Sequence, residues 1–161
     1  MIARQSAAVC LAMAAFVGTY RIGVNQEKLS ASQAASPSGH VMVGPGAVTW
    51  TPRSNGISVA VMSGSPDTPG APFVIRLKLA DGTRVPPHWH PVDEHLTVLS
   101  GTFYMGVGEK LDETNAMALS VGTYAFMPKE VRHFGWTGVE TIVQIHGVGP
   151  FKTYFVEQPS K

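Results

Sequence analysis

Hydrophobic and polar residues alternate along much of this chain, in short runs that are separated by turns. The clearest run is 73–79, where the odd-numbered residues are apolar and Arg76 and Lys78 lie between them. Alternation with a period of two is typical of a half-buried strand. The pattern predicts further strands at 57–62, 85–90, 94–99, 102–107, 123–127, 131–136, 139–146 and 151–156. Only 110–119 could hold a helical turn, so the prediction is an all-β domain with a closed or double-sheet architecture.

Composition agrees with this pattern. Charged residues make up only 14% of the 161 residues, while 17 glycines and 12 prolines are present, which favours tight turns over long surface helices. The length allows a single domain. The net charge of +1 and the absence of a Lys/Arg run exclude a nucleic-acid surface.

The first 35 residues differ from the rest. A short basic start is followed by an apolar run at 7–18, which is too short to span a membrane comfortably and fits a signal peptide. We therefore predict a signal peptide or uncleaved anchor at 1–35, a linker at 36–46 and the domain at 47–161. A buried helix is the weaker alternative, because the apolar run has no polar face. The expected location is periplasmic or extracellular, with membrane contact only through an uncleaved N-terminus. Cys10 would leave with the signal peptide.

Histidine spacing carries the chemical signal. His88 and His90 are two residues apart in a predicted strand, so both side chains project from one face. Glu94 follows a bend at Pro91, and His133 lies in another predicted strand. Three imidazoles and one carboxylate suit Mn, Fe, Co, Ni, Cu or Zn better than Ca or Mg. We predict one divalent transition metal ion.

The spacing of these residues also resembles a known family. Residues 82–101 read Gly82-x5-His88-x-His90-x3-Glu94-x6-Gly101, and residues 122–133 read Gly122-x5-Pro128-x-Glu130-x2-His133. Both strings are similar to the two motifs of the cupin superfamily, and in particular to small exported bacterial single-domain cupins. The second motif departs from the family at Glu130, where glycine is expected, and at Thr137, where asparagine is expected.

The resemblance implies a jelly-roll β-barrel that holds a metal ion inside its mouth through His88, His90, Glu94 and His133. It also implies a dioxygenase, isomerase or decarboxylase that acts on a small oxygenated organic molecule, with Glu94 as a catalytic base. Four protein ligands on an octahedral ion leave two positions for a substrate. A non-catalytic module that binds a metal or a small molecule, as in sensor cupins, remains the alternative.

Other residues carry weaker predictions. Side chains that could line a pocket for a small-molecule ligand are Tyr104, Phe126, Phe134, Trp136, Gln144 and His146. His95 is adjacent to Glu94 in a strand, so it should leave the opposite face. Trp89 should also point away from the ligands, where either a second copy of the chain in a homodimer or the N-terminal strands of its own chain could cover it.

Overall fold

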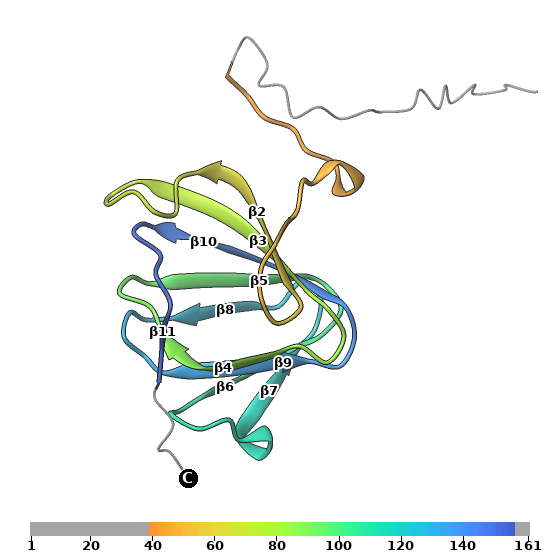
Figure 1. Cartoon of the computed structure of the whole chain (residues 1–161), viewed down its shortest axis with the longest axis vertical. Coiled ribbons are helices and arrows are strands. Elements are labelled where there is room, and N and C mark those ends of the chain that lie inside the picture. The colour runs from red at the N-terminus through yellow and green to blue at the C-terminus, as the bar shows by residue number, and fades with distance from the viewer. Residues whose placement is uncertain (1–38, 157–161) are drawn as a thin grey trace, which may run out of the picture.

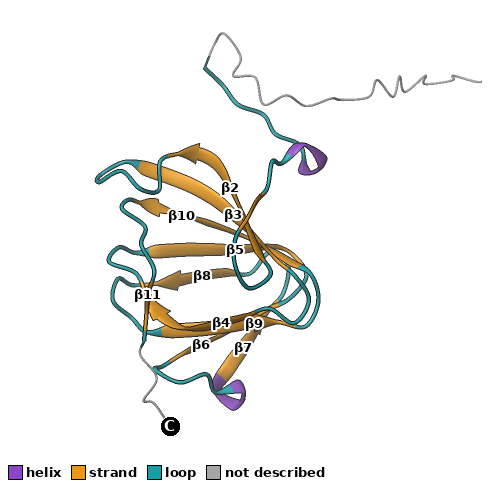
Figure 2. Cartoon of the chain, in the orientation of Figure 1, coloured by secondary structure: helices purple, strands orange, loops and turns teal. Residues whose placement is uncertain are grey.

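Two antiparallel β-sheets lie face to face in the computed structural model, which describes residues 39–156 (Figure 1). The six-stranded sheet has the order β1 (Thr51–Pro52), β2 (Ile57–Gly64), β3 (Pro72–Leu79), β10 (Thr141–Val148), β5 (Glu94–Ser100) and β8 (Tyr124–Met127). The five-stranded sheet has the order β11 (Tyr154–Phe155), β4 (Arg84–Trp89), β9 (His133–Thr137), β6 (Phe103–Val107) and β7 (Ala116–Leu119). The described helices are two short 3₁₀ turns, η1 (Pro45–Ala47) and η2 (Glu113–Asn115) (Figure 2).

One hydrophobic core fills the space between the sheets. Alternate residues of β3, β5 and β10 face inward from the six-stranded sheet and meet inward side chains of β6 from the other sheet. The most buried members of this core are Phe73, Leu79, Val98, Val143 and Ile145. The predicted all-β, double-sheet domain is confirmed.

The segment predicted as a helical turn differs in part. Within 110–119, only η2 is helical, and its start is capped by Asp112, whose carboxylate accepts a hydrogen bond from the Thr114 amide. The chain then continues as β7, which pairs with β6 at the edge of the five-stranded sheet. Strand β1 was not predicted either, because two residues are too few to show an alternating pattern.

The turn at Glu130 retains the backbone that a glycine would adopt. Its φ is +65°, a left-handed conformation that costs a non-glycine residue about 1–2 kcal/mol. The Glu130 amide donates a hydrogen bond to the carbonyl of His90, which ties this turn to the end of β4. The other departure from the motif, Thr137, is buried and donates its hydroxyl to the carbonyl of Ala80. Both departures therefore leave the local geometry intact.

We expect Glu130→Gly to stabilise the protein by about 1 kcal/mol, since relief of strain exceeds the added entropy of the unfolded chain. Urea unfolding of the two proteins measures this difference. The matched control is Lys129→Gly, at a neighbouring position whose φ is not positive, and this substitution should destabilise. A loss of stability in Glu130→Gly equal to that of the control would show that the turn is not strained.

The predicted signal peptide or anchor at 1–35 lies outside the described residues, so export remains a prediction. Within 39–156, no helix is long and apolar enough to cross a membrane.

Candidate metal centre

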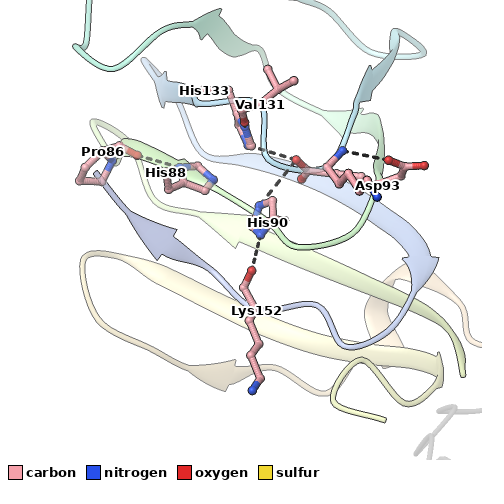
Figure 3. A network of polar contacts seen from close by, with 9 residues as sticks. Pro86, His88, His90, Asp93, Val131, His133 and Lys152 are labelled. Atoms are coloured by element: carbon pink, nitrogen blue, oxygen red, sulfur yellow. Dashed lines mark hydrogen bonds and ion pairs between the residues drawn. The ribbon is translucent and has the colours of Figure 1, made fainter. Parts of the chain in front are cut away.

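Three imidazole rings, those of His88, His90 and His133, lie close together (Figure 3). His88 lies in β4 and pairs across the sheet with His133 of β9, and His90 follows directly after β4. The ring centroid of His88 lies 4.2 Å from that of His133 and 5.0 Å from that of His90. One nitrogen of each ring lies within 4.8 Å of the others, and all three side chains are buried. The predicted strand alternation therefore places His88 and His90 on one face.

A backbone carbonyl orients each ring. Nδ1 of His88 lies 2.7 Å from the Pro86 oxygen, and Nδ1 of His133 lies 2.9 Å from the Val131 oxygen. Nδ1 of His90 lies 2.8 Å from the Lys152 oxygen (Figure 3). A carbonyl oxygen can only accept, so each Nδ1 carries the hydrogen and each neutral ring presents the lone pair of Nε2. This arrangement is typical of histidines that bind a metal ion.

Glu94, the first residue of β5, completes the cluster. Its Oε2 lies 3.2 Å from Nε2 of His133 and 3.7 Å from Nε2 of His90. The same oxygen is buried and has no hydrogen-bond partner among the described residues. A buried oxygen without a donor, facing nitrogen lone pairs, is destabilising unless a cation lies among them. The buried histidine cluster is thus consistent with a bound metal ion, and the identity of that ion is not shown.

The protonation of the cluster also suits a cation. Burial, and after it the repulsion that a protonated His133 would exert, lower the pKa of His88 from 6.5 to about 4. Burial likewise lowers the pKa of His90. Burial of Glu94 would raise its pKa, but contact with His133 and the nearby imidazoles holds that pKa below its ordinary value. At neutral pH, His88 and His90 are therefore neutral imidazoles and Glu94 is a carboxylate anion, the forms that bind metals.

These pKa values predict that the metal-free protein loses stability in mild acid. Between pH 6.5 and about 4, the unfolded chain binds a proton at His88 that the folded chain does not. Lowering the pH through this range therefore favours unfolding, by up to about 3 kcal/mol for His88. Urea unfolding of chelator-treated protein at pH 7 and pH 4.5 measures the effect. His88→Asn should show a smaller loss than the parent, and an equal loss in both would contradict this assignment.

A cavity of about 460 Å³ leads from the cluster to solvent. His88, His90 and Glu94 form part of its wall, and inward side chains of β2, β3, β4 and β10 form most of the rest. A ligand of ordinary small-molecule size would fit this volume. A bound metal ion would therefore be accessible to a molecule from solution.

The segment after β10 closes one side of this cavity. In Figure 1, this dark-blue segment crosses from the six-stranded sheet to β4, where it pairs as β11. The Phe151 ring stacks on His90 with centroids 4.1 Å apart, and the next residue supplies the carbonyl for His90 Nδ1. Phe155 lies 6.0 Å from the His88 ring. Sequence reasoning missed these contacts, because they join residues about sixty positions apart and the segment carries no motif.

The predicted pocket residues do not gather at this cavity. Tyr104 and Trp136 stack on each other, 5.1 Å apart, away from the core. Gln144 accepts a hydrogen bond from Arg76, and Phe126 and His146 both contact His95. The described lining of the cavity beside the ligands includes none of the six, and only Phe134 among them borders a smaller void of about 40 Å³. The reason is strand alternation, since neighbours of inward residues face outward.

Two further side chains lie opposite the ligands. His95 leaves the outer face of β5, where its Nδ1 lies 2.7 Å from the Tyr124 hydroxyl and its ring stacks on His146. Trp89 also points away from the cluster and stacks on Tyr154 with centroids 4.5 Å apart. The chain therefore covers Trp89 with its C-terminal strand, and the predicted homodimer stays a prediction.

The two sheets, the turn motifs and the buried histidines define a cupin with a double-stranded β-helix fold. The family model of the ChrR cupin-like domain matches residues 38–152, and the chain belongs to this family.

Solved structures of similar fold share little sequence. The polyketide cyclase RemF from Streptomyces resistomycificus is 17% identical, with a TM-score of 0.60 over 74% of this chain and 87% of RemF. A putative acetylacetone dioxygenase from Methylibium petroleiphilum is 18% identical, with a TM-score of 0.56 over 73% and 81% of the two chains. An RmlC-like cupin from Shewanella frigidimarina is 14% identical, with a TM-score of 0.54 over 65% and 86%. Among curated proteins, no similar sequence was found.

Proposed function

We propose that this cupin is a metal-dependent enzyme that acts on a small oxygenated organic molecule, with a reaction of the dioxygenase, isomerase or decarboxylase type. One observation carries the proposal. Three imidazole nitrogens and a buried carboxylate oxygen without a donor lie close together, and His88, His90 and Glu94 line a solvent-connected cavity. A purely structural metal site would not need such access.

His88, His90, Glu94 and His133 would hold the ion. When bound, the ion would act as a Lewis acid that polarises an oxygen of the substrate. The carbonyls of Pro86, Val131 and Lys152 keep the three rings in place.

Glu94 is the candidate catalytic base of the site. It is the carboxylate that lines the cavity beside the imidazoles, and its pKa lies below the ordinary value. Because it is ionised, it could accept a proton from a substrate carbon or hydroxyl in the cavity once it is released from the ion. Phe151 and the apolar wall limit the access of water to that proton.

The comparisons support this class of reaction by analogy alone. Two proteins of similar fold are named as a polyketide cyclase and a putative acetylacetone dioxygenase. Both names refer to oxygenated carbon compounds. We infer from this that diketones are the substrates to try first.

The test is turnover by protein loaded separately with Mn, Fe, Ni, Cu and Zn. Oxygen uptake and product analysis are followed across diketones, catechols, flavonols and thiols. We expect turnover with at least one metal, and its loss in His133→Ala. Full metal loading without turnover of any compound would contradict the enzyme proposal.

A non-catalytic binding or sensor module is the second candidate. The observation that favours it is the buried cluster itself, since three oriented imidazoles and a carboxylate can hold a metal ion without any reaction. In that case a ligand would occupy the cavity unchanged, and mass spectrometry of the bound molecule would show this directly.

A further inference from the structure

The wall of the cavity beside the metal ligands is mostly hydrophobic. Ten of its sixteen described lining residues are apolar, and three are candidate metal ligands. The apolar residues come from both sheets and from the C-terminal segment, and they include Val59, Val61, Leu77, Val85, Phe151 and Phe155. The candidate metal ligands thus occupy only one part of the wall of the cavity.

Two of these apolar side chains remain in contact with solvent. Val61 is 49% exposed and Phe155 is 61% exposed, although both line the cavity. Exposed apolar surface in a concave site gains free energy when an apolar group covers it. The cavity would therefore favour a ligand that covers this surface.

Few groups in the cavity can replace water around a hydroxylated ligand. Apart from the metal ligands, the described polar side chains of the wall are Arg53, Asp67 and Thr153. Arg53 and Asp67 lie beyond opposite ends of β2, so the wall between them is apolar. A sugar placed along that wall would lose hydrogen bonds to water without regaining them.

We infer that the ligand of this site is an oxygen-chelating molecule with a hydrophobic body, and not a sugar or another aliphatic polyol. The chelating oxygens contact the metal ion held by His88, His90, Glu94 and His133. The body lies along β2 and β3 and covers Val61 and Phe155. This inference rests on the proposed function, because it requires the metal ion.

Three hydroxamates with one chelating group test the inference. Acetohydroxamate has the smallest body, octanohydroxamate has a hydrophobic one, and gluconohydroxamate has a polyhydroxylated one. Calorimetric titration of the nickel-loaded full chain measures each dissociation constant. We expect octanohydroxamate to bind at least tenfold more tightly than acetohydroxamate, and gluconohydroxamate to bind no more tightly than acetohydroxamate.

Val61→Ser tests where the hydrophobic body lies. The matched control is Val139→Ser, because Val139 is similarly exposed at 51% and does not belong to the described lining of the cavity. Val61→Ser should reduce the advantage of octanohydroxamate over acetohydroxamate at least threefold, while Val139→Ser should leave it unchanged.

The outcomes separate this inference from the proposed function. Equal affinity for the three hydroxamates, or tighter binding of gluconohydroxamate, would overturn the inference and leave the metal site intact. An unchanged advantage in Val61→Ser would overturn the placement of the body. A chain that takes up no nickel, or whose nickel binds no acetohydroxamate, would overturn the proposed function, and the inference with it.

Discussion

Replacing Glu94 by Gln is expected to lower the affinity for the metal ion at least tenfold, since even changes around the ligands of a metal site cost about 10–100-fold. The substitution keeps the shape of the side chain but removes the negative charge that offsets a divalent cation among neutral imidazoles. It also puts an amide NH₂ group in the place of one carboxylate oxygen. The site is buried, and no donor within residues 39–156 bonds to Oε2 of Glu94. Elemental analysis after equal exposure to Mn, Fe, Ni, Cu and Zn measures the loss.

The control for this result is His95→Ala, because His95 is adjacent in sequence but lies on the outer face of β5 with Tyr124 and His146. We expect it to retain about one ion per chain and to change stability by no more than about 0.5 kcal/mol, as for most surface substitutions. If the His95→Ala variant contains no metal while the Glu94→Gln variant retains about one ion per chain, the ligand set and the orientation of β5 are both wrong.

Gly101→Ala is expected to destabilise the fold by about 3 kcal/mol or more, by combining backbone strain with a steric clash. Gly101 adopts a φ of +73°, which L side chains rarely adopt. A Cβ atom there would lie 2.6 Å from the carbonyl oxygen of Glu140 and 2.4 Å from the Thr141 hydroxyl. Thr141 is fully buried and bonds to the backbone of Thr102, so it cannot move away easily.

Gly82→Ala separates the two contributions. Gly82 has nearly the same φ, +71°, but nothing lies within 4 Å of an added Cβ. The Gly82→Ala variant should therefore be destabilised only by backbone strain, by about 1–2 kcal/mol. Urea unfolding of both variants gives the difference, and equal losses would show that the packing against Thr141 tolerates a methyl group.

The features that the sequence revealed are those that depend on local spacing. Strand alternation over 73–79 and the His88-Trp89-His90 spacing set which side chains face inward, and the structure places both as predicted. The two glycines of the first motif, Gly82 and Gly101, both adopt a positive φ in the structure.

The features that the sequence did not reveal depend on contacts between segments that are distant in the chain. The stacking of Phe151 on His90 and the Lys152 carbonyl have no local signature. The aromatic residues Tyr104, Phe126 and Trp136 were assigned to a pocket by residue type, but they lie on outer faces of the sheets. The cavity is lined instead by ordinary core residues such as Val59 and Leu77, which hydrophobicity alone cannot distinguish from the rest of the core.

X-ray absorption spectroscopy of the zinc-loaded chain tests the central claim most directly. The account predicts one ion per chain with three imidazole nitrogens at about 2.0–2.1 Å and a carboxylate oxygen at a similar distance. His88, His90 and His133 would supply the nitrogens and Glu94 the oxygen. A chain that retains no zinc after dialysis, or a bound ion with fewer than three imidazoles, would contradict it.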